Sequence, residues 1–358
     1  MKKIYLALLI ILAFSAAAPA WAATAPAKKV WKPIAPKGYA PITWASAPGI
    51  ASFYRAAADN GALDFVTRIY LPQNQINFIL STSSPKILNS ASTSTAITAN
   101  TFGGDMTNFS NLSFKRLAAE TAKIIDPAIK FLWDVSFFNM KSPFSDLSMA
   151  AKYTFGTTTI ISSGSRSVPD MALPRRMLLI NNQTGRASIK DFDAAAFTSP
   201  KSGDQALEGF SPAVAKSDSA GGLASRLFLG VDTTNQELII YCSQAATVNE
   251  ASNALIAAGV PLANQLEADG GASAACGYNL PGQYFVEPTR SLPILMGAKT
   301  ILARGTANAK TVNVRSGPGT KFPIVTHLTK GAAIIAYGES NGWYRIGDGQ
   351  WAIKTLIK

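Results

Sequence analysis

Short apolar runs separated by turn residues fill most of the chain from Asp64 onward, and this pattern limits the fold more than any other feature. Runs bounded by Gly, Pro, Asn or Asp are typical of β-strands. They occur at residues 65–72, 76–80, 130–139, 175–192 and 225–242, and again after residue 310. A chain of 358 residues is long enough for about two domains. We therefore predict an α+β mixed domain, strand-rich with few helices, followed by a small all-β barrel.

Two of the apolar runs have the pattern of β-hairpins. Residues 175–192 are divided by polar residues at 182–185, and residues 225–242 by polar residues at 232–236. Asn, Asp and Gly favour the turn conformations that connect adjacent antiparallel strands. Each segment is therefore predicted to be two strands joined by a short turn.

Two segments have the pattern of an amphipathic helix. Residues 112–125 carry apolar side chains at helical spacing and end before Pro127. The clearer helix begins after Thr247, a good N-cap residue, with Glu250 three positions on as in a capping box. Gly259 provides its stop.

Changes in composition along the sequence predict how the chain is divided into segments. We predict a signal peptide at residues 1–22, an extended lead-in at 23–63, the larger domain at 64–298, a linker at 299–308 and the barrel at 309–358. Residues 81–111, rich in Ser, Thr, Asn and Ala, are predicted to be a long surface loop within the larger domain.

The first residues have the composition of a secretory signal. Lys2 and Lys3 precede an apolar run at residues 4–18, and Ala20 and Ala22 form the small-x-small pattern that signal peptidase cleaves. An uncleaved membrane anchor is less favoured, because the run is shorter than the roughly 20 apolar residues of a spanning helix. We expect a secreted or periplasmic protein of the cell envelope, with no membrane span after signal cleavage.

The chain is basic. Its 33 Lys and Arg against 21 Asp and Glu give a formal charge of +12, and cleavage of the signal peptide lowers this to +10. Residues 309–358 hold +5 of that charge. A basic barrel suits an anionic polymer. Nucleic acid would suit the charge equally, but an exported protein does not meet it, so no nucleic-acid partner is predicted.

The chain has one histidine, His327, which falls in the barrel. Zinc hydrolases and nucleophile triads usually depend on one to three imidazoles. Any catalysis in the larger domain would therefore use carboxylates, arginine and backbone amides. No cofactor is predicted, and the sequence leaves a metal requirement open.

The only cysteines are Cys242 and Cys276. Export permits a disulfide. Two buried thiols that behave as small apolar side chains are the alternative. The residues alone leave both alternatives open.

The barrel segment resembles bacterial SH3-like (SH3b) domains. The resemblance rests on residues 312–319, 328–331, 338–344 and 350–352, which occur in the family's order. Such domains commonly attach proteins to the cell wall, so the resemblance implies a cell-wall polymer as partner. Trp343 and Tyr344 are the implied wall contacts, with core packing as the alternative for Trp343.

The larger domain resembles the phosphodiester glycosidase family of the uncovering-enzyme type (N-acetylglucosamine-1-phosphodiester alpha-N-acetylglucosaminidase-like). Three stretches carry the resemblance: residues 132–139, 225–231 and, after the helix that follows Thr247, residues 267–273. It implies a glycan or sugar-phosphodiester substrate.

The resemblance also implies roles for particular residues. Arg226 would hold a phosphoryl oxygen in a bidentate contact, which lysine reproduces poorly. Asp269 would act as general acid/base or nucleophile, with Asp134 as the second carboxylate. Gly270 and Gly271 would offer backbone N–H groups to an anion. The further implied substrate contacts are Ser273, Ser136 and Asn139.

Several residues depart from the family's pattern. Asp134-Val135-Ser136 stands in place of Asn-Gly-Gly, and Ala272 replaces the third glycine of the loop. Cys242 and Ser243 replace an Asp-Gly pair. The inferred topology places Cys242 near Cys276, which favours a disulfide beside the ligand loop.

Two functions follow from these observations. The first is an exported hydrolase of a sugar-1-phosphodiester or related glycosidic bond, brought to cell-envelope glycans by the SH3b module. The second is a non-catalytic glycan-binding protein that keeps the fold with a degenerate site. A structural alternative is that residues 269–271 are only a turn. Wall peptidases and amidases are excluded because they require more histidines than the one present.

Overall fold

The structure is a computed structural model in which parts of the chain are described. These are residues 30–56, 61–80, 86–88, 128–134, 151–155, 157–161, 174–193, 204–212, 222–268, 270–278, 284–288 and 294–358. Three predicted segments lie outside these ranges: the signal peptide, the helix at 112–125 and the loop at 81–111. Of the loop, only residues 86–88 are described.

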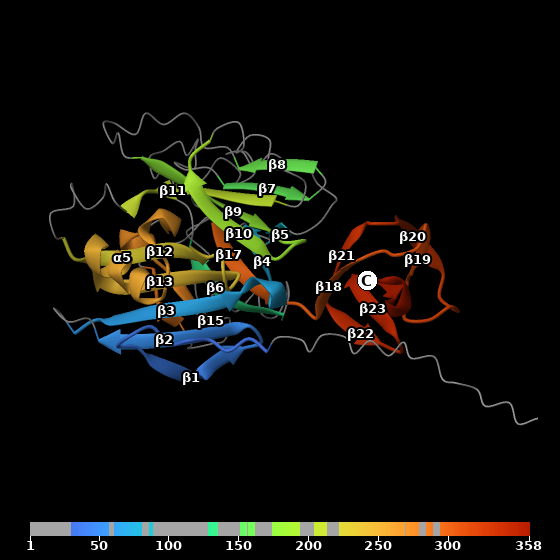
Figure 1. The fold of residues 1–358 in the computed structure, drawn as a ribbon, viewed down its shortest axis with the longest axis horizontal. Helices are drawn as coiled ribbons and strands as arrows, with labels where there is room; N and C mark the ends of the chain where they lie inside the picture. Colours follow the sequence, from blue (N-terminus) through green and yellow to red (C-terminus); the bar gives the residue numbers. More distant parts are fainter. Residues whose placement is uncertain are drawn as a thin grey trace, which may run out of the picture. The chain divides into compact units, whose positions relative to one another are not determined.

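The largest element is an antiparallel sheet of 11 strands (Figure 1). Its main path has the order β1-β2-β3-β13-β12-β14-β11-β7-β8, and the β9–β10 hairpin joins it through β11. The strands are β1 (Ala40–Ala47), β2 (Ile50–Ala56), β3 (Leu63–Tyr70), β7 (Ala151–Phe155), β8 (Thr157–Ile161), β9 (Arg175–Asn181), β10 (Arg186–Asp191), β11 (Asp204–Phe210), β12 (Ala224–Asp232), β13 (Glu237–Ala246) and β14 (Gln265–Glu267).

A second antiparallel sheet has six strands in the order β16-β15-β6-β17-β4-β5. They are β4 (Asn74–Leu80), β5 (Lys86–Leu88), β6 (Ile129–Asp134), β15 (Cys276–Tyr278), β16 (Tyr284–Val286) and β17 (Ile294–Thr300). The α-helix of the described residues is α5 (Val248–Ala257), and short 3-10 helices are η1 (Leu71–Gln73), η4 (Leu262–Asn264), η5 (Gly271–Ser273) and η6 (Lys354–Leu356). No helix in these ranges is long and apolar enough to cross a membrane.

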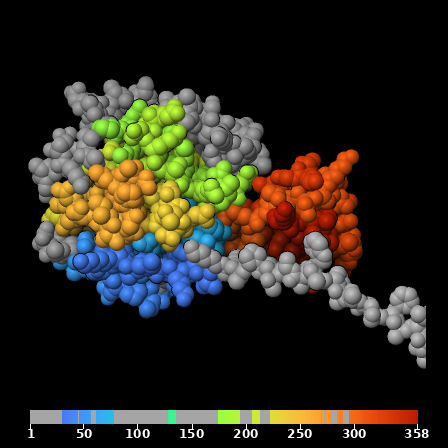
Figure 2. Space-filling view, in the orientation of Figure 1, coloured from blue at the N-terminus to red at the C-terminus, as the bar shows by residue number. Residues whose placement is uncertain are grey.

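The C-terminal residues form a small all-β module, drawn in orange and red in Figure 2. A five-stranded sheet has the order β20-β19-β24-β23-β22, and β18 pairs with β21. The strands are β18 (Ala303–Thr306), β19 (Thr311–Arg315), β20 (Ile324–Thr329), β21 (Ala333–Ala336), β22 (Gly338–Ser340), β23 (Trp343–Gly347) and β24 (Gln350–Ile353). Together with the strand-rich larger domain, this module confirms the predicted fold class.

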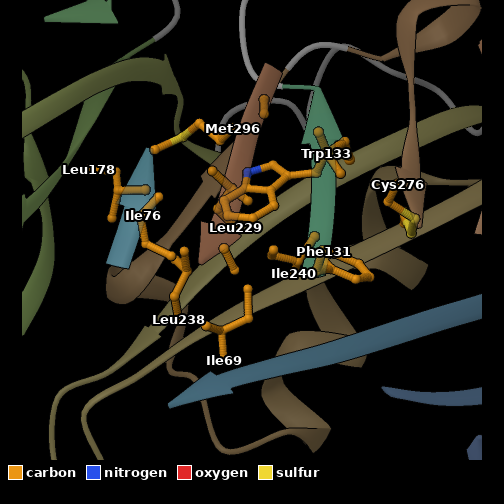
Figure 3. Packing of buried hydrophobic residues seen from close by; sticks show 14 of the residues in the cluster. Ile69, Ile76, Phe131, Trp133, Leu178, Leu229, Leu238, Ile240, Cys276 and Met296 are labelled. Atoms are coloured by element: carbon orange, nitrogen blue, oxygen red, sulfur yellow. A yellow bond between two sulfur atoms is a disulfide. The ribbon is translucent and has the colours of Figure 1, made fainter. Parts of the chain in front are cut away.

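The two sheets of the larger domain enclose one apolar core, seen from close by in Figure 3. Trp133 and Met296 of the six-stranded sheet pack toward Leu229 and Ile240 of the 11-stranded sheet. The opposite face of the 11-stranded sheet has a second core, which includes Leu255 and other residues of α5. The 11-stranded sheet is therefore buried on both faces along β3, β12 and β13.

Local sequence signals correctly predicted the hairpins and the clear helix. β9 and β10 pair on either side of residues 182–185, and β12 and β13 pair on either side of the turn after Asp232. The Thr247 side chain accepts a hydrogen bond from the Glu250 N–H, and the Glu250 carboxylate accepts one from the Thr247 N–H. This reciprocal pair is the predicted capping box.

Part of the segment assigned to the lead-in forms a hairpin. Strands β1 and β2 lie within residues 40–56 and pair with each other, and β2 also pairs with β3. Ile42, Ile50 and Phe53 are buried. Their apolar spacing is hard to recognise in the sequence because Ala and Pro dominate its surroundings.

The segment assigned to the linker, residues 299–308, holds the end of β17 and all of β18. Arg304 fixes it in place, because its guanidinium donates to the backbone carbonyls of Pro72, Asn74 and Asn182. Three bonds from one half-buried cation to backbone oxygens order a sequence that has little apolar periodicity.

Candidate functional site

A row of polar side chains crosses four neighbouring strands at one end of the 11-stranded sheet. In the strand register Arg55 stands opposite Asp64, Asp64 opposite Ser243, and Ser243 opposite Arg226. Residues directly opposite each other in antiparallel strands share a face. This is the face that α5 covers, since Phe228, two residues from Arg226, belongs to the α5 core. We call these four residues the polar row.

Asp64 is the buried centre of one half of the polar row. Arg55 donates through Nε and Nη2 to Asp64 Oδ2, both at 3.2 Å, and the Tyr241 hydroxyl donates to Asp64 Oδ1 at 2.9 Å. Burial, followed by the negative charge of Asp64, raises the pKa of Tyr241 far above its usual value. Tyr241 therefore remains a hydrogen-bond donor to the carboxylate.

Arg55 reaches the solvent from this half of the row. Its side chain is 31% exposed, whereas that of Asp64 is 1% exposed. The guanidinium carbon lies 4.7 Å from the centroid of the Tyr39 ring, a cation–π distance. Tyr39 is buried beneath the Arg55 guanidinium.

Arg226 anchors the other half of the row. Its Nη1 donates to Glu267 Oε1 at 3.2 Å, its Nε to the Ala246 carbonyl at 3.3 Å, and its Nη2 to the Gly222 carbonyl at 3.3 Å. Each guanidinium nitrogen thus has a partner within the protein. These contacts hold the beginning of β12 against the end of β13 and against β14.

Glu267 lies on the same face as Arg226, because it stands opposite Phe228 in the register of β12 and β14. Its side chain is largely buried, and burial raises its pKa above the usual value of 4.5, an effect that the Arg226 charge only partly offsets. Glu267 therefore binds its proton more tightly in the folded protein than in the unfolded chain.

This shift predicts a pH dependence of stability. In the window between the unfolded and the raised folded pKa of Glu267, the folded state binds more protons, so the free energy of unfolding falls as pH rises. Glu267→Gln is expected to flatten that decrease, measured as urea midpoints between about pH 4 and pH 8. Asp348→Asn changes an exposed carboxylate and should keep the decrease. An unchanged slope in Glu267→Gln would contradict the assignment.

Residues 270–273, which we call the glycine loop, lie against the beginning of β12. A Cβ atom on Gly270 would be 2.9 Å from the Ser225 carbonyl oxygen, so only glycine fits that approach. Gly271 has φ +59, a conformation that favours glycine. Ser273 is buried and its N–H donates to the Gly270 carbonyl. The structure thus brings these three residues close to the strand that carries Arg226.

Asp134 takes a different position. It ends β6, is buried, and its N–H donates to the Ala275 carbonyl just after the glycine loop. Trp133 points into the core between the sheets, so the next residue along the strand faces away from that core. Arg226 faces the α5 side of the other sheet. The structure therefore does not bring the Asp134 carboxylate to the face that carries Arg226.

Three predicted site residues, Asp269, Ser136 and Asn139, lie outside the described residues. In the parts that are described, no group of three or more His, Cys, Asp or Glu side chains could hold a metal ion.

Cys242 and Cys276 form a disulfide, which confirms the pairing that the resemblance favoured over two free thiols. It joins β13 of the 11-stranded sheet to β15 of the six-stranded sheet, and both cysteines belong to the core between the sheets. The crosslink lies next to Ser243 of the polar row in sequence and three residues after Ser273 of the glycine loop.

The two aromatic residues predicted to contact the cell wall differ in exposure. Trp343 is 7% exposed, which fits the alternative of core packing. Tyr344 is partly exposed, and the Lys354 Nζ lies 5.4 Å from its ring centroid. The same Nζ donates to both Glu339 carboxylate oxygens at 2.9 Å.

Sequence reasoning missed Arg55, Asp64 and Glu267 as site residues. Arg55 and Asp64 become neighbours of Arg226 only through the pairing of β2, β3, β13 and β12. Glu267 could have been found from its position, because it begins the stretch at residues 267–273 that carries the resemblance.

Comparison with known proteins identifies the C-terminal module. Residues 310–354 match the family model of the bacterial SH3 domain, which confirms that resemblance. No curated protein sequence matches the chain.

Two solved structures are distantly similar. The zebrafish N-acetylglucosamine-1-phosphodiester alpha-N-acetylglucosaminidase catalytic domain, auto-inhibited by pro-peptide, has 11% identity and a TM-score of 0.43 over 71% of this chain and 84% of that chain. A hypothetical protein from Synechocystis has 13% identity and a TM-score of 0.35 over 73% of this chain and 64% of that chain.

Proposed function

We propose that the protein is exported to the cell envelope, where its SH3 domain binds a wall polymer and its larger domain hydrolyses a sugar-1-phosphodiester or related glycosidic bond. The observation that carries the proposal is the Arg226–Glu267 ion pair beside the glycine loop. It combines a cation, a carboxyl group with a raised pKa and closely packed backbone at one end of a sheet. These are the groups that cleavage of an anionic sugar ester needs.

The envelope location is supported by three independent features. The sequence begins with the pattern of a signal peptide. The Cys242–Cys276 disulfide is typical of an oxidising compartment. The bacterial SH3 domain at residues 310–354 is of a kind that commonly attaches proteins to cell walls.

Within this proposal, Arg226 contacts the phosphoryl group and Gly270 and Gly271 offer backbone N–H groups to its oxygens. Asp269 acts as general acid/base or nucleophile. Glu267 serves as the second carboxyl group in place of Asp134, because it shares a face and an ion pair with Arg226. Burial raises its pKa, so Glu267 takes up a proton more readily than an exposed glutamate, as a general acid must.

A second candidate is a non-catalytic glycan-binding protein, favoured by the charge balance of the site. Arg55 pairs with Asp64 and Arg226 pairs with Glu267, so two cations face two carboxylates. All three Arg226 nitrogens have protein partners. A neutral set of donors and acceptors beside the Tyr39 ring suits sugar hydroxyls better than a phosphate.

The test is hydrolysis of nitrophenyl phosphodiester sugars and nucleotide sugars by the purified protein. Arg226→Lys keeps the charge but loses the bidentate geometry, and Asp269→Asn loses the proton-transfer group, so each should lower kcat/KM at least about tenfold. Arg186→Lys alters an exposed arginine on β10 and should leave activity unchanged.

An inactive wild-type protein that still binds soluble wall glycans would support the second candidate. Full activity in Arg226→Lys would remove Arg226 from the proposed site.

A further inference from the structure

Strand β20 (Ile324–Thr329) is unusual because almost its whole length is open to solvent. It stands at the edge of the five-stranded sheet, where β19 is its only partner among the described strands. Every residue from Ile324 to His327 is exposed, and only Leu328 is partly covered. Successive residues of a strand point to opposite faces, so both faces and the free edge of β20 are uncovered.

Two adjacent apolar side chains occupy this open strand. Ile324 is 44% exposed and Val325 is 50% exposed. β-Branched residues favour the extended conformation, and an edge strand presents unpaired N–H and C=O groups to any further strand. The strand therefore offers both main-chain hydrogen bonds and apolar contacts to an added segment.

The segment that contains β20 carries positive but no negative charge. Lys321 and Lys330 are exposed and flank the strand at its two ends, and His327 is exposed within it. Residues 321–330 contain no Asp or Glu, and the whole barrel has a formal charge of +5. An added segment with carboxylates would be attracted along its length. A second copy of β20 would place lysines opposite lysines.

We propose that the free edge of β20 binds an extended acidic peptide by strand addition. Main-chain hydrogen bonds give this mode its affinity, and alternate side chains give it specificity. Ile324 and Val325 contact the apolar residues of the peptide, and Lys321 and Lys330 pair with its carboxylates. The inference rests on the proposed wall attachment and specifies it: the barrel recognises a peptide component of the wall rather than a glycan or phosphate chain.

The first experiment measures binding of the full-length protein to a labelled six-residue peptide, by fluorescence anisotropy; the peptide has two central Val residues, which point to opposite faces, and two Glu residues at each end. Binding is expected, together with slower amide hydrogen exchange at residues 324–329. The same peptide N-methylated at alternate residues keeps its charge but loses main-chain donors, so its affinity should fall at least about tenfold. Replacing Glu with Lys in the peptide should abolish binding.

The second experiment changes the protein. Lys321→Glu with Lys330→Glu should weaken binding at least about tenfold. The matched pair Lys37→Glu with Arg186→Glu changes the net charge equally at exposed positions outside the barrel and should have little effect. Equal weakening in both pairs would show attraction by net charge alone and overturn the proposal.

Other outcomes identify other occupants. Unchanged affinity for the N-methylated peptide would mean that β20 binds polyanions without strand pairing. Concentration-dependent dimers that exclude the peptide would mean that a second copy covers the edge. Sedimentation with isolated wall tests the proposed attachment separately. A protein that sediments but ignores the peptide overturns only this inference, and one that binds the peptide but does not sediment overturns only the wall attachment.

Discussion

Arg68→Met or Glu237→Gln is expected to lower the free energy of unfolding by about 3–5 kcal/mol, because each leaves a buried charge without its ion-pair partner. Arg68 and Glu237 are 6% and 3% exposed, and Arg68 Nη1 donates to Glu237 Oε2. Arg68 Nη2 also donates to the carbonyl of Ala258, the C-cap residue of α5. The pair thus joins β3, β13 and the helix that covers the polar row.

Urea unfolding followed by tryptophan fluorescence measures this loss, since Trp133 is fully buried in the larger domain. Lys354→Met breaks an exposed ion pair with Glu339 and should leave the urea midpoint almost unchanged. The double variant Arg68→Met with Glu237→Leu should regain much of the stability that either single variant loses, because no buried charge is left. Single variants within about 1 kcal/mol of wild type would contradict the prediction.

The sequence predicted the elements whose causes are local. The turn residues at 182–185 and the Thr247–Glu250 capping box each act within a few residues, and the β9–β10 hairpin and α5 form as expected. The sequence did not predict the β1–β2 hairpin, because alanines and prolines surround the few large apolar residues that the hairpin buries. Local chemistry therefore indicates elements well where turn and capping residues mark their ends.

The candidate site depends on pairing between strands that are far apart in the sequence, and no local sequence pattern predicts this pairing. Asp64 and Ser243 are opposite each other only because β3 pairs with β13, and this contact joins two distant parts of the chain. Strand alternation likewise decides that Asp134 faces away from the core that Trp133 enters. Motif order placed Arg226 and residues 270–273 in one predicted site, and in the structure Gly270 lies against Ser225 beside Arg226. A motif carries no information about which face of a strand a carboxylate takes.

Removal of the Cys242–Cys276 disulfide is expected to lower the free energy of unfolding by about 4 kcal/mol. The two cysteines are 34 residues apart, and a crosslink over a loop of that length removes this much conformational entropy from the unfolded chain. The paired variant Cys242→Ala with Cys276→Ala should show the loss in urea unfolding. Wild-type protein unfolded under reducing conditions should match it, and thiol titration of denatured, unreduced wild type should find no free cysteine.

The same crosslink holds together the two sides of the proposed site. Cys242 precedes Ser243 of the polar row, and Cys276 follows the loop whose Gly270 packs on Ser225 next to Arg226. Loss of the disulfide should therefore speed amide hydrogen exchange at residues 270–276 more than in β20. The disulfide does not crosslink β20 to any other strand. Equal change in both segments would mean that the disulfide acts only by lowering the conformational entropy of the unfolded chain, and that packing of the glycine loop against β12 does not depend on it.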